Sequence, residues 1–495
     1  SVLSFRSLTF GTCDHTSILA HFIATLVECD SLKVVATGGI IDERLMALCR
    51  SPDEKAVNLF PDLGIYLFER LLLSHPLIHS LRSLRGNARG CVYTEPLWGI
   101  PFNLYAPYVS VYMLAMGLSD VQIGSLVSIG LALQIVTALM SGVITDKLGR
   151  KRATLIFDLL SWSVPTLIWA VAQDYRYFLV AAIVNSLWRI TMNSWSCLMV
   201  EDTDPKLLVD IYTWIYIAGL LSAFFAPVAG LLINAFTLVP TMRGLYLLAF
   251  LMMTTKFLVM NALVKETRQG QVRMAESKQQ SIIDLLREYT GVIRHILAAP
   301  QTLFTLGIML VMSITQMVHG TFWSIYVTEK LQIPTQHLAL YPFARSVVML
   351  LFFFTVMPRL RELNPRHPML LGFGSFVLSQ LLLILAPDKS YIMVLMSTFL
   401  EACSIATVSI MLDRRIVVTV DAAERARIQA VMYVVVIVFT SPFGWVAGNL
   451  SQLDRTLPFA LNIGLFAVGA ILAHHASRLP ELITHAAHPV EVESL

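Results

Sequence analysis

Seven long stretches of this 495-residue chain contain no Asp, Glu, Lys or Arg. They run over residues 96–119, 121–145, 211–242, 295–328, 367–387, 428–453 and 456–477. Each is long enough for a helix that crosses a lipid bilayer, which needs about 20 predominantly apolar residues. Only 14% of all residues are charged and 56% are hydrophobic, whereas soluble domains are about 25% charged. The sequence therefore predicts an all-α protein that crosses a membrane several times.

Hydropathy and helix-breaking residues together predict twelve membrane-spanning helices. Ser119, followed three residues later by Gln122, has the pattern of a capping box, which marks the start of the second helix. The predicted spans are 97–117, 121–142, 153–172, 176–199, 211–235, 243–264, 303–327, 337–357, 368–386, 390–412, 427–450 and 456–476.

Basic residues in the short connections predict the orientation. If the first span runs outward from the cytoplasm, the connections on the cytoplasmic side carry eighteen Lys and Arg residues and those on the outer side carry five. Short cytoplasmic loops are enriched in Lys and Arg. Both termini are therefore predicted to lie in the cytoplasm, with the protein in the cell membrane.

The first 92 residues are more polar than the rest of the chain. Their apolar stretches are short and lack the charged start and the cleavage pattern of a signal peptide. We predict that residues 1–92 form a poorly packed extension or are a sequence artefact, with a small folded regulatory module as the alternative.

The remainder divides into two halves of six spans, at 93–264 and 301–478, followed by a C-terminal tail at 479–495. The linker at 265–300 is polar at first and amphipathic from Ile282 to Ile296, which predicts a helix on the inner membrane surface.

The connection between the second and third spans carries a distinctive motif. It reads Gly142-Val-Ile-Thr-Asp146-Lys147-Leu-Gly149-Arg150-Lys151-Arg152. The first glycine permits close approach of helices, and Gly149 permits a tight turn. Asp146 is an anion at the inner surface that can meet a helix N-terminus or an arginine. This segment resembles the signature loop of the major facilitator superfamily, whose pattern is GxxxD(R/K)xG(R/K)(R/K).

The resemblance implies a fold and a mode of action. It implies twelve helices in two six-helix bundles that rock about a central cavity, and a loop that acts as a latch on the closed inner side. The corresponding loop of the second half, at 356–362, lacks the glycine and the aspartate, so no second latch is expected. The latch residues expected here are Gly142, Asp146, Lys147, Gly149, Arg150 and Lys151, with Asp158 close enough to the inner surface to join them.

Polar residues embedded in the spans are the candidates for binding and coupling, because a charged side chain at a helix centre costs about 2.5–3.5 kcal/mol. In the family that the motif resembles, spans one, four, seven and ten line the central cavity, and the embedded polar residues of this chain fall on those four. The candidates are Asn103 and Tyr105 on span one, Asn185, Arg189 and Asn193 on span four, Gln316 and His319 on span seven, and Glu401 on span ten.

Two interpretations of Arg189 and Glu401 remain open. They could form a buried ion pair that holds the bundles together. Alternatively, Arg189 meets an anionic group of the substrate or Glu401, and Glu401 takes up a proton in one state, because separating the pair would change the proton affinity of the carboxyl group. His319 is interpreted as a satisfied polar residue rather than a proton carrier.

Other embedded residues are open to simpler interpretations. Lys256 on span six is a cavity group or a partner of nearby polar backbone. The tryptophans at positions 98, 162, 169 and 214 are interpreted as interface anchors or packing residues.

The leading hypothesis is a secondary active transporter that exports amphipathic organic compounds by alternating access, coupled to protons. The alternatives are an uptake carrier for a polar or anionic metabolite, with Arg189 as its clamp, and a non-transporting sensor or scaffold on the carrier fold. The sequence contains no P-loop, HExxH, GxSxG or dinucleotide fingerprint, so an enzyme is not expected. The expected partners are the lipid bilayer, a small-molecule substrate and protons, without a cofactor, metal or nucleic acid, and the protein is expected to be a monomer.

Overall fold

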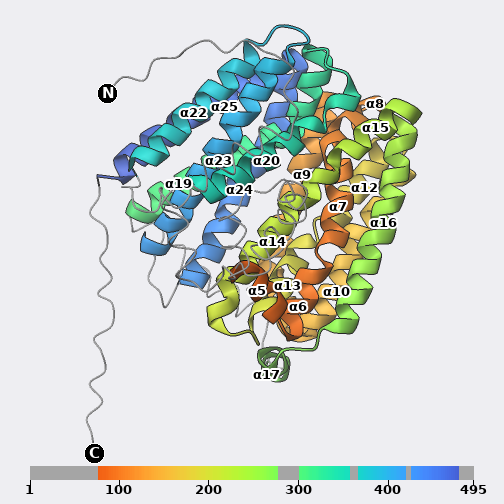
Figure 1. Cartoon of the computed structure of the whole chain (residues 1–495), viewed down its shortest axis with the longest axis vertical. Coiled ribbons are helices and arrows are strands. Elements are labelled where there is room, and N and C mark those ends of the chain that lie inside the picture. The colour runs from red at the N-terminus through yellow and green to blue at the C-terminus, as the bar shows by residue number, and fades with distance from the viewer. Residues whose placement is uncertain (1–75, 277–299, 357–365, 420–424, 479–495) are drawn as a thin grey trace, which may run out of the picture. The chain divides into compact units, whose positions relative to one another are not determined.

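A computed structural model describes residues 76–276, 300–356, 366–419 and 425–478 (Figure 1). All regular secondary structure in these ranges is helical. The chain divides by its internal contacts at Arg82/Ser83. Helix α5 (Pro76–Ser83) comes first, and the helices of the first bundle are α6 (Gly86–Thr94), α7 (Pro96–Tyr105), α8 (Val109–Ala115), α9 (Asp120–Leu148), α10 (Arg150–Asp158), α11 (Val164–Ala170), α12 (Tyr175–Asn185), α13 (Trp188–Val200), α14 (Leu208–Ser222), α15 (Ala226–Phe236) and α16 (Leu238–Leu263).

The short helix α17 (Arg268–Glu276) follows the first bundle, and the second bundle begins at Pro300. Its helices are α19 (Pro300–Ile325), α20 (Leu340–Thr355), α22 (Arg366–Ile384), α23 (Tyr391–Thr419), α24 (Arg425–Leu453) and α25 (Leu457–Ala476). The prediction of an all-α membrane protein is confirmed, whereas the count of twelve spans is not fully confirmed.

Nine of the described helical segments are long and apolar enough to cross a membrane. The predicted spans at 97–117, 176–199 and 337–357 correspond instead to interrupted or shorter helices: α7 with α8, α12 with α13, and α20. Several spans are irregular beside a proline, as where the 3₁₀ turn η2 (Ala106–Tyr108) and the π turn η3 (Leu159–Ser163) interrupt helices. Proline lacks the N–H group that continues the helical bond pattern, so it breaks or kinks helices.

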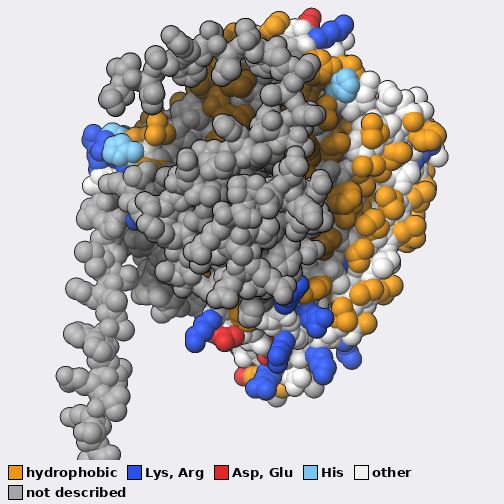
Figure 2. All heavy atoms as spheres, in the orientation of Figure 1, with side chains coloured by type: hydrophobic (Ala, Val, Ile, Leu, Met, Phe, Trp, Pro, Cys, Tyr) orange, Lys and Arg blue, Asp and Glu red, His pale blue; other side chains and the backbone are white. Residues whose placement is uncertain are grey.

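Exposed apolar side chains cover the outer face of the first bundle. On α16 they include Leu247, Leu251, Leu258 and Leu263, each at least 47% exposed. Figure 2 shows hydrophobic side chains spread over this side of the molecule, while lysines and arginines gather at the end near α17. A large exposed apolar surface of this kind suits contact with lipid.

The second span begins as predicted. The backbone N–H of Gln122 donates to Ser119 Oγ at 3.2 Å, and the backbone N–H of Ser119 donates to Gln122 Oε1 at 2.9 Å. This reciprocal pair satisfies two backbone donors at the start of α9. The capping-box prediction is confirmed.

Helix α6 packs with the first bundle, although the sequence placed most of it in the extension. Asn87 Nδ2 donates to the carbonyl of Lys265 at 2.9 Å, and the backbone N–H of Lys265 donates to Asn87 Oδ1 at 2.8 Å. Cys91 on the same helix is fully buried. The described packing therefore begins near residue 83 rather than 93, while residues 1–75 lie outside the described residues.

The two bundles meet along α9 and α24. At Gly124 a Cβ atom would lie 2.2 Å from the carbonyl oxygen of Gly444 and 3.0 Å from Gly448 Cα, so the two backbones are in direct contact. The backbone N–H of Trp445 donates to Ser128 Oγ at 2.7 Å. Three glycines thus allow an approach that any side chain would prevent.

Three predicted features lie wholly or mostly outside the described residues. The amphipathic segment from Ile282 to Ile296 lies outside the described residues, as do the C-terminal tail from residue 479 and most of the loop at 356–362.

Candidate functional site

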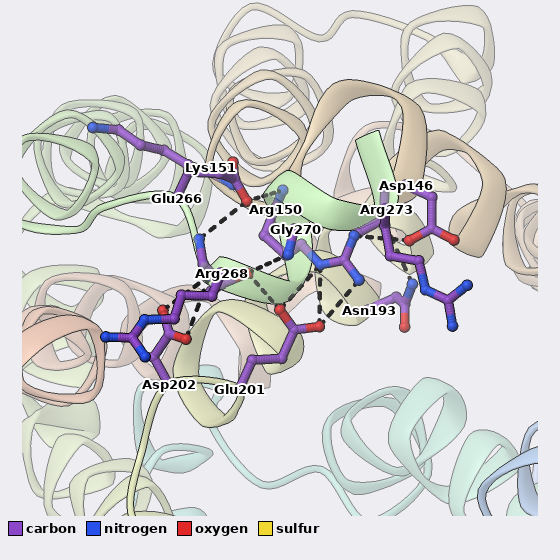
Figure 3. Close-up of polar contacts among 12 residues, drawn as sticks. Asp146, Arg150, Lys151, Asn193, Glu201, Asp202, Glu266, Arg268, Gly270 and Arg273 are labelled. Carbon is purple, nitrogen blue, oxygen red and sulfur yellow. Dashed lines mark hydrogen bonds and ion pairs between the residues drawn. The ribbon is translucent and has the colours of Figure 1, made fainter. Parts of the chain in front are cut away.

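The motif between α9 and α10 is the centre of a charged network, which we call the latch cluster: Asp146, Arg150, Glu201, Glu266 and Thr267 (Figure 3). Arg150 Nη1 lies 2.7 Å from Asp146 Oδ1, and its Nη2 lies 3.0 Å from Glu201 Oε1. The hydroxyl of Thr267 donates to Glu201. Asp146 thus meets an arginine, one of the two partners that the sequence left open, and that arginine lies in the same motif.

Glu266 completes the latch cluster by capping α10. Its two carboxylate oxygens accept the backbone N–H groups of Arg150 at 2.9 Å and Lys151 at 3.0 Å. A carboxylate at a helix N-terminus satisfies free donors and complements the helix dipole. Gly149 has a φ of 83°, and a Cβ there would lie 2.6 Å from Glu266 Oε2. This position therefore requires glycine for both its conformation and its space.

Three predicted latch residues lie outside the latch cluster. Gly142 has no atom within 4 Å of where its Cβ would be, so no close helix contact occurs there. Lys147 is exposed. Asp158 does not join the latch cluster, because it is buried within the first bundle and accepts a 2.7 Å hydrogen bond from Thr191 Oγ1.

Arg189 is half-buried on α13. Its Nε donates to Gln134 Oε1 at 2.9 Å, and its guanidinium carbon lies 4.2 Å from the ring centre of Trp188. Nη1 also contacts the sulfur of Met192 at 3.7 Å. Among the described residues no carboxylate lies within ion-pair distance of Arg189, so the predicted pair with Glu401 is not formed.

The other first-bundle candidates make contacts within their own bundle. Asn103 donates to a carbonyl of its own helix at 2.8 Å, and Asn185 to a carbonyl of the η3 turn at 2.7 Å. Asn193 Nδ2 lies 3.4 Å from Thr145 Oγ1. Tyr105 is only 2% exposed and packs in the bundle core. The structure therefore places Tyr105 away from an open cavity.

Glu401 instead pairs with His319 in the second bundle. His319 Nε2 lies 3.2 Å from Glu401 Oε2, and both side chains are largely buried. His319 Nδ1 is buried and has no hydrogen-bond partner among the described residues, and its ring stacks at 5.9 Å on Trp323. The two residues come from α19 and α23. Gln316 is exposed on the same helix as His319.

A cavity of about 370 Å³ lies inside the first bundle, between α7, α10, η3, α13 and α16. We call it the tryptophan cavity. Its charged lining groups are Glu95, Asp158 and Lys256, and Lys256 Nζ lies 2.9 Å from Glu95 Oε2. Its aromatic lining side chains are Trp98, Phe102, Trp162, Trp188, Trp195 and Phe257.

The tryptophan cavity changes the interpretation of several residues. Lys256 is paired with a carboxylate rather than with polar backbone. Trp98 and Trp162 line the cavity with their ring centres 5.1 Å apart, rather than anchoring the protein at the membrane interface. Trp169 packs against the first bundle's core, as one of the two predicted interpretations had it.

Charged groups also join the bundles at the end of α9 opposite the latch cluster. We call these the gate cluster: Asp120, Glu329, Ser451 and Arg455. Asp120 Oδ2 accepts a 2.7 Å hydrogen bond from Ser451 Oγ and lies 3.5 Å from Arg455 Nε. Arg455 Nη1 lies 3.4 Å from Glu329 Oε2. The two bundles are therefore connected by charge close to the contact of Gly124 with Gly444 and Gly448, which we call the glycine crossing.

Sequence reasoning missed Glu95, Glu201 and Glu266 because each lies just outside an apolar stretch. A usable signal existed for Glu95. Lys256 lies deep in the long apolar helix α16, whose only other charged residue is Arg243 near its start, and a buried ammonium needs an acidic partner. Glu95 immediately precedes the first charge-free stretch, at the start of a predicted span.

Several solved structures share the fold. The nucleoside transporter NupG is similar with a TM-score of 0.62 at 15% identity, covering 80% of this chain and 100% of that one. A POT family transporter crystallised with a thioalcohol-conjugated peptide gives 0.60 at 14% identity, with 80% and 97% covered. The human organic anion transporter MFSD10 gives 0.53 at 14% identity, with 78% and 98% covered.

No curated protein matches the sequence. The sequence model described as Major Facilitator Superfamily matches residues 99–444, which is more than half of the chain. The motif, the two bundles and this match agree. The chain belongs to the Major Facilitator Superfamily and is a membrane-embedded secondary transporter of a small molecule.

Proposed function

We propose that the protein exports amphipathic organic compounds from the cytoplasm in exchange for protons. The observation that carries the proposal is the buried pair of His319 and Glu401, on two helices of the second bundle, with 3.2 Å between Nε2 and Oε2. A carboxylate taken out of water needs a partner or a proton. An imidazole can supply either a neutral or a charged partner near neutral pH.

The pair can therefore exchange a proton with its surroundings while Glu401 keeps His319 as a hydrogen-bonding partner. Glu401 takes the coupling role, and His319 becomes its direct partner instead of Arg189. This assigns His319 a part in coupling that the sequence did not favour.

The surroundings of Arg189 support an amphipathic cargo. The guanidinium stacks on Trp188 and contacts the sulfur of Met192, which is 48% exposed. A side chain that is charged at one end and flanked by an aromatic ring and a thioether suits compounds with both polar and apolar parts.

The orientation supports loading from the cytoplasm. The excess of basic residues at the end that carries the latch cluster favours a cytoplasmic position for that end. The gate cluster and the glycine crossing connect the bundles at the opposite end. The proposed state of the carrier is therefore closed toward the outside.

The test is transport in proteoliposomes loaded with rhodamine 6G, with and without a pH gradient. Glu401→Gln should lower gradient-driven export at least about tenfold, because the coupling group can no longer exchange a proton, while downhill dye movement continues. Glu276→Gln, an exposed carboxylate on α17, is the control. Gradient-driven export by Glu401→Gln at the rate of the control would refute proton coupling through this pair.

A second candidate is uptake of an anionic metabolite. It is favoured by the absence of any carboxylate within ion-pair distance of Arg189 in the described part of the chain. Arg189→Gln should then abolish uptake of carboxylates in the same vesicles and leave rhodamine 6G transport unchanged. A protein that moves neither class, and tolerates Asp146→Asn without any change, would instead be a sensor or scaffold on the carrier fold.

A further inference from the structure

The tryptophan cavity has the features of a binding site that lies within one bundle. Its volume of about 370 Å³ falls in the range of small-molecule pockets, about 300–1,000 Å³. Four of its lining side chains are tryptophans, drawn from α7, η3 and α13. Indole rings offer flat faces on which another aromatic ring can stack.

The charges in the cavity do not cancel. Two carboxylates, Glu95 and Asp158, accompany a single ammonium, Lys256. That ammonium is already bonded to Glu95 at 2.9 Å. Asp158 has no basic side chain within ion-pair distance among the described residues, and its one described hydrogen bond comes from the neutral hydroxyl of Thr191. With all three groups ionised, one negative charge is left without a direct counter-charge.

The aromatic lining suits positive charge, and two of its rings already lie near one cation. Lys256 Nζ lies 5.7 Å from the ring centre of Trp195 and 5.9 Å from that of Trp98. The faces of tryptophan rings attract positive charge, most strongly where water is excluded. The buried indole nitrogen of Trp195 also has no hydrogen-bond partner among the described residues. An acceptor atom on a ligand would satisfy it.

Arg189 does not compete for this site. It lies against the ring of Trp188, is not part of the cavity lining, and donates to Gln134. Trp188 lines the cavity, with its ring 6.5 Å from that of Trp162, and contacts the guanidinium of Arg189. The volume of the cavity, its tryptophan rings and its excess of carboxylates therefore all favour a small, flat, positively charged ligand.

We propose that the tryptophan cavity binds planar aromatic amines that carry one positive charge, with the ring stacked among the tryptophans and the cationic nitrogen against Asp158. This deepens the transport function proposed above and rests on it for the claim that such amines are cargo. The binding itself requires no transport.

The experiment is calorimetric titration of the full chain in detergent micelles with three probes. N-methylquinolinium is planar, aromatic and cationic; 2-naphthoate has a similar bicyclic ring system and the opposite charge; tetraethylammonium is cationic without a ring. N-methylquinolinium should bind at least about tenfold more tightly than either of the others, since only it satisfies both the rings and the charge. Equal or tighter binding of 2-naphthoate, or no binding of N-methylquinolinium, would overturn the proposal.

Two variants locate the binding. Asp158→Asn keeps the size of the side chain and should weaken N-methylquinolinium binding at least about tenfold, whereas Asp413→Asn, the same change on α23, should not alter it. If Asp158→Asn fails to fold, Trp162→Leu removes one stacking face of a ring whose described ring contacts are all aromatic, and should weaken binding about fivefold or more. Unchanged affinity in the folded variant would refute the location.

The titrations in micelles and the export assay in proteoliposomes together distinguish this proposal from the proposed function. Tight N-methylquinolinium binding without any gradient-driven rhodamine 6G export would reject the exchange mechanism and retain the site. Proton-driven export by a protein that binds no N-methylquinolinium would reject the site and retain the mechanism.

Discussion

The glycine crossing of α9 and α24 makes a sharp prediction about conformational balance. In Gly124→Ala the new methyl carbon would lie 2.2 Å from the carbonyl oxygen of Gly444 and 3.1 Å from its carbonyl carbon. Both atoms belong to backbone, so no side-chain rotation can relieve the contact. Helices α9 and α24 must therefore move apart at Gly124, where the two bundles are in contact.

The size of the effect follows from these distances. Ordinary contact begins at 3.4 Å, so the closest pair at 2.2 Å must move apart by 1.2 Å. Overpacking of this kind costs about 1–3 kcal/mol. If that cost falls only on the state in which the gate end is closed, the ratio of closed to open molecules drops by about 5- to 150-fold.

Electron spin resonance distance measurements can follow the change. Spin labels on Ala115→Cys and Leu453→Cys, both exposed and on opposite bundles, report the separation at the gate cluster once the chain's six native cysteines are replaced. The matched control is Gly130→Ala on the same helix, where a Cβ would have no neighbour within 4 Å. Replacing a helical glycine by alanine otherwise stabilises a helix by about 0.5–1 kcal/mol, and both variants share that gain.

Gly124→Ala should shift the distance distribution toward longer separations, and Gly130→Ala should not. If both variants give the distribution of the parent chain, the crossing at Gly124 does not hold the gate end closed and the reasoning is refuted.

Three further predictions concern stability, each measured by thermal unfolding in detergent. Glu266→Ala removes the cap of α10 and should lower the free energy of unfolding by about 1–2 kcal/mol. The control Glu276→Ala removes a half-exposed ion pair and should change that free energy little. Equal losses of stability in the two variants would contradict the capping role. Lys256→Met leaves the buried carboxylate of Glu95 without its ammonium partner and should lower the free energy of unfolding by about 3–5 kcal/mol. Adding Glu95→Gln should restore part of that stability. No recovery of stability in the double variant would argue against the pair of Lys256 and Glu95. Hydrogen bonds from the backbone N–H and hydroxyl of Thr456 hold the pKa of Asp454 below its usual value. The stabilising effect of the Asp454 carboxylate is therefore complete above about pH 4 and is lost as the pH falls through the lowered pKa. Asp454→Ala should be less stable than the parent at neutral pH, and the difference should vanish in acid.

The fold could be predicted from the sequence because its strongest determinants are local. A bilayer forces backbone polar groups into helices, so long charge-free stretches specify helices directly, and the capping box at Ser119 marks where one starts. The interrupted helices were harder to predict. Whether a proline such as Pro107 ends, kinks or merely bends a span depends on which neighbouring groups satisfy the freed carbonyls, and those neighbours come from elsewhere in the chain.

The site was predictable only in part, because it depends on which face each helix turns inward. Arg189 and Glu401 were recognised as embedded charges, yet their partners proved to be Gln134 and His319. Partner choice follows from helix rotation and depth, which residue spacing within one helix does not fix. Asp158 shows the same limit, since one position along a helix can lie at the membrane surface or within the bundle.

The close contact at Gly124 has a mechanical consequence. Helix α9 has 29 residues, and Gly124 is only four residues from its first. If the bundles pivot where they touch, α9 acts as a lever with unequal arms. At a rise of 1.5 Å per residue, the long arm from Gly124 to Leu148 measures about 36 Å. A rotation of α9 by about 10° would move its far end by about 6 Å. A displacement of little more than about 1 Å at the first residue of α9 therefore accompanies a displacement of several ångströms beside Asp146.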